Sequence, residues 1–208
     1  PYDSGSYASS TTYITGGAVV KACEKLIDKM ELIAAGLMNC SKEEVQFEGN
    51  MVKRLGTDQS VSVEEIATKS QLFNDESAEV TAMHTSPVSP PPYMVGMVEI
   101  ELDKLTGKVD ILDYKAVVDC GIPINPALAR IQTEGGLVQG IGHTLMENVT
   151  YNRIGRPMEC NFAQYKLPTR LDMGKLQVEF EHSYEPTGPF GAKSIGEIVI
   201  NTPAPAIA

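Results

Sequence analysis

The spacing of apolar residues changes along this 208-residue chain, and this change constrains the fold more than any other feature. Apolar side chains recur every three or four residues from Val19 to Leu37, which is the repeat of one helix face. This repeat predicts a long helix over residues 11–38, and a similar stripe predicts a second one over roughly 127–148. From Val98 to Asp103 apolar and acidic side chains alternate instead, as in a strand with one solvated face, and this pattern predicts a strand over residues 94–103.

The predicted strands are expected to form a mixed or antiparallel sheet. A threonine–glycine turn at residues 106–107 joins the strand at 94–103 to a partner at 109–119, and residues 176–182 alternate as a further strand. An amphipathic helix must bury its apolar stripe, so we expect both long helices to pack on this sheet. The sequence therefore predicts an α+β fold.

Two short sequence patterns between the first predicted helix and the middle of the chain indicate a turn and a hairpin. Ser41 and Glu44 have the spacing of a capping box. The segments 45–47 and 51–55 flank a Glu-Gly-Asn turn, which predicts a hairpin.

A proline-rich stretch offers the best internal boundary. Residues 73–92 are polar and end in Ser-Pro-Val-Ser-Pro-Pro-Pro, which favours a stiff, extended connection. The prediction is one subdomain over residues 1–72, this connection, and a second subdomain over 93–208. A long surface loop inside a single domain is the alternative. Because the chain begins at Pro1 and stops within a helix-like run, we expect it to be a piece of a longer polypeptide.

Composition excludes several classes of protein. The net charge of -10, from 17 basic and 27 acidic residues, argues against a nucleic-acid partner, which requires clustered Lys and Arg. No apolar run approaches the roughly 20 residues of a membrane span. Four scattered cysteines without a Cys-x-x-Cys pair argue against a zinc or iron–sulfur site in this chain, and they predict a reducing, cytoplasmic location.

Hydroxyl side chains lie just before and at the start of the first predicted helix. Ser9, Ser10, Thr11 and Thr12 can all cap a helix, and the first acidic residue of the helix is Glu24. A helix start that is rich in hydroxyls and free of acids can hold a phosphate. Simple capping is the alternative.

The segment 191–197 places one carboxylate, Glu197, directly after Gly196 and before three apolar residues. A carboxylate beside buried apolar structure can serve as a general base. A surface glutamate after a turn is the alternative interpretation.

The second predicted helix is unusually rich in glycine. Its polar face carries Gln132, Gln139 and His143, and four glycines lie within or beside that face. Glycine costs about 1 kcal/mol per helical position, so we expect a close approach by another part of the protein or by a cofactor.

Three motifs resemble, in order, those of the molybdenum hydroxylases, the xanthine dehydrogenase and aldehyde oxidase family. They are PTGPFGAKSIGE at 186–197 with PAPAIA after it, INPALARIQTEGGLVQGIG at 124–142, and PYDSGSYASSTTYITGGA at 1–18. Ser10 stands where family members often have Arg, and Ser194 and Ile198 stand where many have Gly and Pro.

This resemblance implies a molybdenum–molybdopterin cofactor, as the pterin itself or in its dinucleotide form, with no obligatory protein ligand to the metal. It implies that [2Fe–2S] clusters and FAD lie on other domains or subunits. It also implies Glu197 as the catalytic base and Gln132 as a pterin contact. The segment that holds the pterin phosphate corresponds to Ala8, Ser9, Thr11 and Thr12.

The resemblance further implies oxidation of a small molecule at carbon with oxygen from water. The segment SYASSTTY resembles bacterial purine hydroxylases more than aldehyde oxidases. The expected substrate is therefore a purine-like N-heterocycle of the xanthine or hypoxanthine type. Aldehydes or nicotinate are alternative substrates. Expected partners are the remainder of the molybdenum subunit, iron–sulfur and FAD subunits or domains, and a second copy in a homo-oligomer. A non-catalytic scaffold or interface domain without cofactor is the alternative function.

Overall fold

The structure is a computed structural model that describes residues 5–73, 77–86 and 88–208. The beginning of the motif at 1–18 and four residues of the predicted connection therefore lie outside the described residues.

The chain divides into two compact units. The small unit comprises Ile14–Thr85, and the large unit combines Pro1–Tyr13 with Ser86–Ala208. The boundary between Thr85 and Ser86 lies inside the stretch 73–92 that the sequence singles out as a connection, whereas residues 1–13, which were expected in the first subdomain, belong to the large unit.

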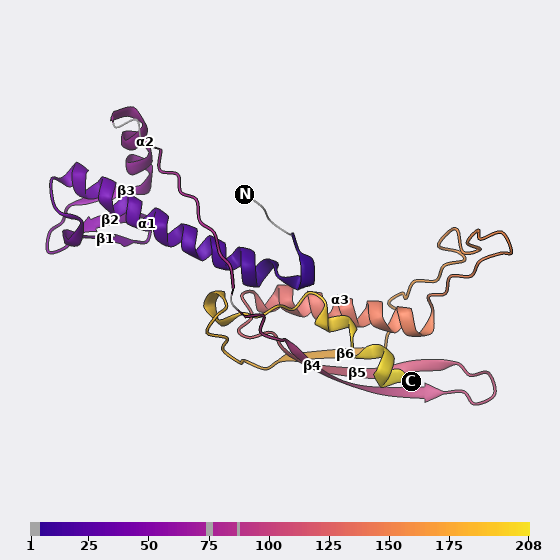
Figure 1. Cartoon of the computed structure of the whole chain (residues 1–208). Coiled ribbons are helices and arrows are strands. Elements are labelled where there is room, and N and C mark those ends of the chain that lie inside the picture. Colours follow the sequence, from indigo (N-terminus) through magenta and orange to yellow (C-terminus); the bar gives the residue numbers. More distant parts are fainter. Residues whose placement is uncertain (1–4, 74–76, 87) are drawn as a thin grey trace. The chain divides into compact units, whose positions relative to one another are not determined.

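In the small unit, helix α1 (Gly16–Met38) packs on a three-stranded antiparallel sheet (Figure 1). The sheet has the order β1 (Val45–Glu48), β2 (Met51–Arg54) and β3 (Ser60–Ser62), and helix α2 (Val63–Phe73) follows it. The prediction that α1 packs on the sheet of residues 94–119 is wrong. The apolar stripe of α1 is covered by the strands that follow it directly in sequence, with a core of Met30, Ile33, Ala34, Val52, Val61 and Ile66.

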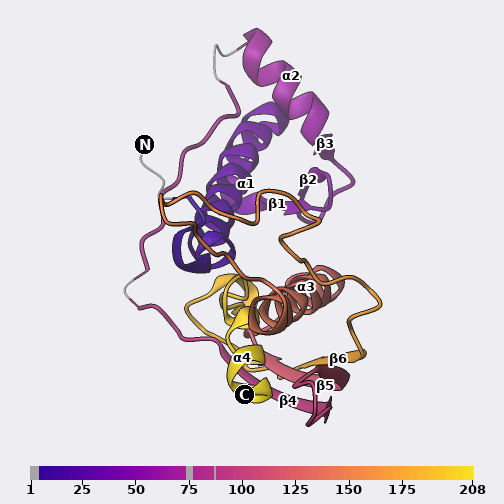
Figure 2. The ribbon, with the colours of Figure 1, turned by 90° about the vertical axis from the view of Figure 1, so that its right-hand side faces the viewer.

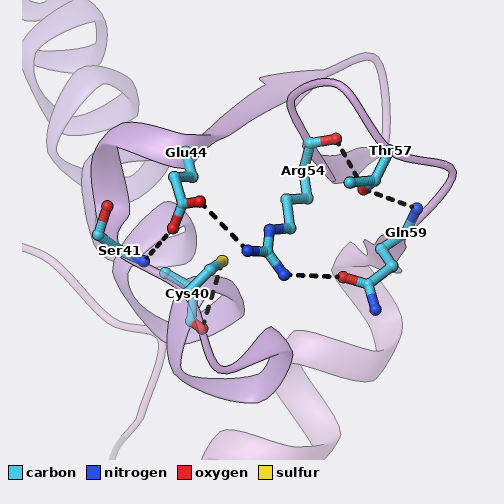
Figure 3. A network of polar contacts seen from close by, with 7 residues as sticks. Cys40, Ser41, Glu44, Arg54, Thr57 and Gln59 are labelled. Carbon is cyan, nitrogen blue, oxygen red and sulfur yellow. Dashed lines mark hydrogen bonds and ion pairs between the residues drawn. The ribbon is translucent and has the colours of Figure 1, made fainter.

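A polar network holds the turn after α1 to the hairpin (Figure 3). The Ser41 amide donates to the Glu44 carboxylate at 2.9 Å, and the predicted capping box is present at η3 (Lys42–Glu44). Glu44 also pairs with Arg54 at 3.2 Å. The hydrogen bond from the Ser41 amide, followed by that from Arg54, lowers the pKa of Glu44.

The large unit is built on a mixed sheet of three strands with the order β4 (Tyr93–Leu102), β5 (Val109–Asp119) and β6 (Lys175–Phe180). Strands β4 and β5 are antiparallel, whereas β5 and β6 are parallel. The predicted strands are all present, and the third one ends two residues earlier than expected.

Helix α3 (Pro126–Leu145) and the C-terminal segments η5 (Ile198–Ile200) and α4 (Pro203–Ile207) pack together with this sheet. Helix α3 contacts β6, and α4 contacts β4 (Figure 2). The core between them contains Ile111, Tyr114, Leu137, Ile141, Val178 and Ile207. None of the helices in the described parts of the chain is long and apolar enough to cross a membrane.

The glycines of α3 allow the C-terminal segment to approach the helix closely. A Cβ atom at Gly136 would collide with Val199 of η5, and one at Gly140 would lie 2.6 Å from the Pro203 ring. Gly135, in contrast, has open space where its Cβ would be. The close approach expected from the sequence is therefore made, at Gly136 and Gly140, by the protein's own C-terminal residues.

Neighbouring glycines in α3 should respond oppositely to alanine. Gly135→Ala should raise the free energy of unfolding by up to about 1 kcal/mol, because alanine favours the helix and meets no atoms. Gly136→Ala should lower it by about 1–3 kcal/mol, because the added methyl overpacks against Val199. Urea unfolding followed by circular dichroism measures both changes, and equal effects at the two positions would contradict this packing.

Candidate cofactor-binding and active site

A cavity of about 630 Å³ opens in the large unit, within the range that binds small molecules and cofactors. Its wall combines the N-terminal segment, the turn after β5 with the first turns of α3, and the loop before η5. Apolar side chains form part of the wall, including Ile122, Ile124, Leu128 and Ile195. The polar part includes Ser6, Ser9, Thr11, Thr12, Gln132 and Glu197, together with Asn125 and Lys193.

Two glycines let the backbone after β5 lie against the loop that leads to Glu197. Gly121 has φ +70° and Gly191 has φ +82°, values that side chains disfavour. Gly121 forms an antiparallel bridge with Ala192, and a Cβ on Gly121 would collide with the Gly191 carbonyl oxygen. The amide of Ile122 donates to the Gly191 carbonyl at 2.8 Å, which closes the contact.

An ion pair reinforces this contact. The Lys193 ammonium lies 2.7 Å from a carboxylate oxygen of Asp119, the last residue of β5. The Lys193 amide donates to the Cys120 carbonyl at 2.7 Å. Both Lys193 and Cys120 line the cavity, so the ion pair belongs to its wall.

Two side chains from other segments hold the residues around the predicted base. The Gln132 amide nitrogen donates to the Gly196 carbonyl at 2.8 Å, and the Ser9 hydroxyl donates to the Glu197 carboxylate at 3.0 Å. Glu197 itself is exposed within this chain. The carboxylate therefore faces an open cavity while the backbone before it is tied to α3.

The N-terminal segment reaches the cavity through a backbone conformation that is rare outside glycine. Ala8 and Ser9 have φ values of 51° and 57° in the left-handed region, and such residues cost about 1–3 kcal/mol and cluster at functional sites. The π-helical turn η2 (Thr11–Thr15) follows and leads directly into α1. The Thr11 hydroxyl donates to the Ser6 hydroxyl at 2.9 Å.

Tyr13 anchors this segment to the rest of the large unit. The side chain is buried, and its hydroxyl lies 2.8 Å from the Ser86 hydroxyl and 2.5 Å from that of Thr187. Thr187 belongs to the loop that leads to Glu197. The same tyrosine therefore ties the hydroxyl-rich turn to the loop of the predicted base.

The structure brings most of the predicted site residues together. Ser9, Thr11, Thr12, Gln132 and Glu197 line one cavity. Ala8 lines an adjoining hollow of about 300 Å³ together with Ser9 and Glu197.

Sequence reasoning did not assign Asp119, Lys193 or Tyr13 to the site. A signal for Asp119 does exist, because this acidic residue ends a strand just before a Cys-Gly turn. Nothing in the sequence predicts the pairing of Lys193 with a residue 74 positions away.

The donor set of the cavity fits a phosphate-bearing pterin. Hydroxyl groups of Ser6, Ser9, Thr11 and Thr12 lie along its polar wall, and η2 has no acidic residue in its first turn. Hydroxyl and backbone N–H groups at a helix start favour phosphate. Within the described ranges, no three His, Cys, Asp or Glu side chains are grouped so that they could hold a metal ion.

Comparison with known proteins identifies the family. The model of the molybdopterin cofactor-binding domain matches residues 1–174, and the chain belongs to this family. The gamma subunit of the 6-hydroxypseudooxynicotine dehydrogenase complex of Paenarthrobacter nicotinovorans is 35% identical over 98% of this chain and 27% of the relative. A probable hypoxanthine oxidase of Escherichia coli K12 is 34% identical over 100% of this chain and 22% of the relative.

Solved structures share the fold. CO dehydrogenase from Oligotropha carboxidovorans matches with a TM-score of 0.83 and 24% identity over 99% of this chain and 26% of that one. Quinoline 2-oxidoreductase from Pseudomonas putida 86 matches with a TM-score of 0.78 and 25% identity, over 97% of this chain and 27% of that one. The chain thus spans about a quarter of the length of the relatives it matches.

The cysteines should differ in reactivity. Burial, reinforced by the charge of Asp119, raises the pKa of the Cys120 thiol. A raised pKa lowers the thiolate fraction, so at mildly alkaline pH iodoacetamide should label Cys120 about tenfold or more slowly than the exposed Cys160. Mass spectrometry of the labelled peptides gives both rates. Equal rates would show that Cys120 is not buried in this wall.

Proposed function

We propose that this chain supplies the base and part of the cofactor site of a molybdenum-dependent hydroxylase. The observation that carries the proposal is the meeting of Ser9, Gln132 and Glu197, from three distant segments, around one cavity. The family assignment supports it, because the family binds molybdopterin.

The hydroxyl-rich turn is proposed to hold the phosphate of the cofactor. Ser9, Thr11 and Thr12 carry hydroxyl groups on the cavity wall. The Ser9 and Thr11 hydroxyls, which donate to Glu197 and Ser6 in this structure, would turn to donate to the phosphate when it binds. Ala8 brings the backbone into the adjoining hollow, which it lines together with Ser9. Gln132 lies on the cavity wall and is proposed to contact the pterin, besides its bond to Gly196. When bound, the cofactor would supply the two-electron acceptor that hydroxylation at carbon requires.

Glu197 is proposed to act as the general base. Its carboxylate accepts the proton of the oxygen nucleophile as that oxygen attacks the substrate carbon. The Ser9 hydroxyl donates to one carboxylate oxygen and leaves the other without a bond to a described side chain. The tie between Gln132 and Gly196 restricts the backbone immediately before the carboxylate.

The proposed substrate is a purine-like N-heterocycle of the xanthine or hypoxanthine type. The apolar part of the wall, with Ile122, Ile124 and Leu128, suits the face of a flat ring. The names of two relatives refer to hypoxanthine and to 6-hydroxypseudooxynicotine, which supports a nitrogen-containing substrate. Turnover of hypoxanthine, xanthine, nicotinate and an aldehyde by the complete protein would separate this proposal from its alternatives.

We infer that electrons pass to [2Fe–2S] and FAD groups on other domains or subunits, and that the enzyme acts in the cytoplasm as a homo-oligomer. The family match does not favour the scaffold alternative. Stoichiometric molybdenum and pterin in the natively purified protein would support the enzyme, and their absence would favour the scaffold.

Replacement of Glu197 by Gln should lower turnover by about 10²–10⁴-fold, because the amide cannot accept the proton. Molybdenum content and the circular dichroism spectrum should be unchanged. Glu179→Gln, an exposed change on β6, is the control and should keep normal turnover. Near-normal turnover of the Glu197→Gln protein would disprove the role of this residue.

Replacement of Thr12 by Val should weaken cofactor retention, because the change removes a hydroxyl from the cavity wall at nearly constant volume. The measurement is the ratio of pterin to protein after dialysis. Thr106→Val, at the exposed turn between β4 and β5, is the matched control. Unchanged pterin content in the Thr12→Val protein would remove this residue from the phosphate site.

A further inference from the structure

The ion pair between Lys193 and Asp119 is more enclosed than surface pairs in this protein. The side chains of Lys193 and Asp119 are 8% and 16% exposed. In the pair of Lys115 with Asp113, farther back along β5, the corresponding values are 56% and 22%. Water therefore screens the pair of Lys193 and Asp119 only weakly.

Further contacts fix the geometry of this pair. The second carboxylate oxygen of Asp119 accepts the Gly121 amide at 3.0 Å. The Lys193 ammonium also lies 5.5 Å from the centre of the Tyr93 ring, within the range of a cation–π contact. Each charged group thus has more than one partner, which restricts both side chains to one arrangement.

Stability alone is a weak reason to keep such a pair. Replacing a buried ion pair by apolar residues is often neutral or stabilising, because both charges lose their hydration when they are buried. What this pair adds is orientation. The Lys193 backbone amide binds Cys120 and the Lys193 side chain binds Asp119. Two successive residues at the end of β5 therefore fix the position of Lys193.

This orientation bears on Glu197, which lies four residues after Lys193 on the same cavity wall. Gln132 and Ser9 hold the far end of this stretch at Gly196 and Glu197. Without the ion pair, only backbone contacts, such as the hydrogen bond from the Lys193 amide to the Cys120 carbonyl, would hold the near end of this stretch.

We propose that Asp119 and Lys193 form a positioning pair that orients residues 193–197 and so presents the Glu197 carboxylate to the cavity. The effect on turnover rests on the proposed function, because it requires Glu197 to be the base. Misplacement of a reacting group by about 1 Å can cost about 10²-fold in rate. The pair should therefore affect kcat more than KM.

The test uses the complete protein purified with its cofactor and the substrate that it turns over. Lys193→Met should lower kcat by about 10–10²-fold and leave KM within about twofold. Amide hydrogen exchange of residues 193–197 should accelerate, while exchange in α3 stays unchanged. Lys115→Met is the matched control and should change none of these values.

Lys193→Met leaves the enclosed Asp119 carboxylate unpaired, which by itself can destabilise the fold. A second variant therefore distinguishes an effect on the position of Glu197 from an effect on the stability of the protein. The double variant Asp119→Asn with Lys193→Met removes both charges and keeps an acceptor for the Gly121 amide. Its melting temperature should stay near that of the unmodified protein, while kcat remains low and exchange at 193–197 remains fast. Lys193→Arg, which retains the positive charge, should restore much of kcat.

Normal kcat and normal exchange in the double variant would overturn the proposal. Faster exchange throughout the large unit with loss of molybdenum would also overturn it, since the pair would then be merely structural. If Glu197→Gln retained turnover while Lys193→Met still accelerated exchange at 193–197, the base assignment would fail and the anchoring of this loop would stand.

Discussion

The backbone contact between the end of β5 and the loop before Glu197 is the constraint on which the candidate site depends. It exists because Gly121 and Gly191 accept left-handed conformations and because Gly121 has no side chain to collide with the loop. Once the two segments touch, Asp119 meets Lys193 and the cavity wall is closed at this side. A side chain at Gly121 would push the loop before Glu197 away from the end of β5, and Lys193 would then lie too far from Asp119 to pair with it.

Helix α3 links the packing of the fold to the chemistry of the site. Gly136 and Gly140 let the C-terminal segment approach the helix, and this segment begins directly after Glu197. Another side chain of the same helix, Gln132, binds the carbonyl of Gly196. The position of the predicted base therefore depends both on the packing of the C-terminal segment against α3 and on the hydrogen bond from Gln132 at the cavity wall.

The N-terminal segment contributes differently, through polar groups and local strain. Ser9 adopts a left-handed conformation and bonds to Glu197, while Tyr13 buries its ring and ties the segment to Thr187. These polar groups, together with Gln132 and Glu197, line the cavity that is proposed to hold the cofactor.

The sequence by itself determined the two long helices, the three strands of the large unit and the hairpin of β1 and β2, because periodicity and turn residues are local signals. The ordered motifs also pointed to five residues that line one cavity, namely Ser9, Thr11, Thr12, Gln132 and Glu197. Strand β3 and helix α2 were not predicted. Only the tertiary structure decided that α1 packs on its own sheet, that Val199 and Pro203 fill the space beside the glycines of α3, and that Lys193 pairs with Asp119. These contacts join residues far apart in the chain, and their geometry depends on packing and charge compensation that no local pattern encodes.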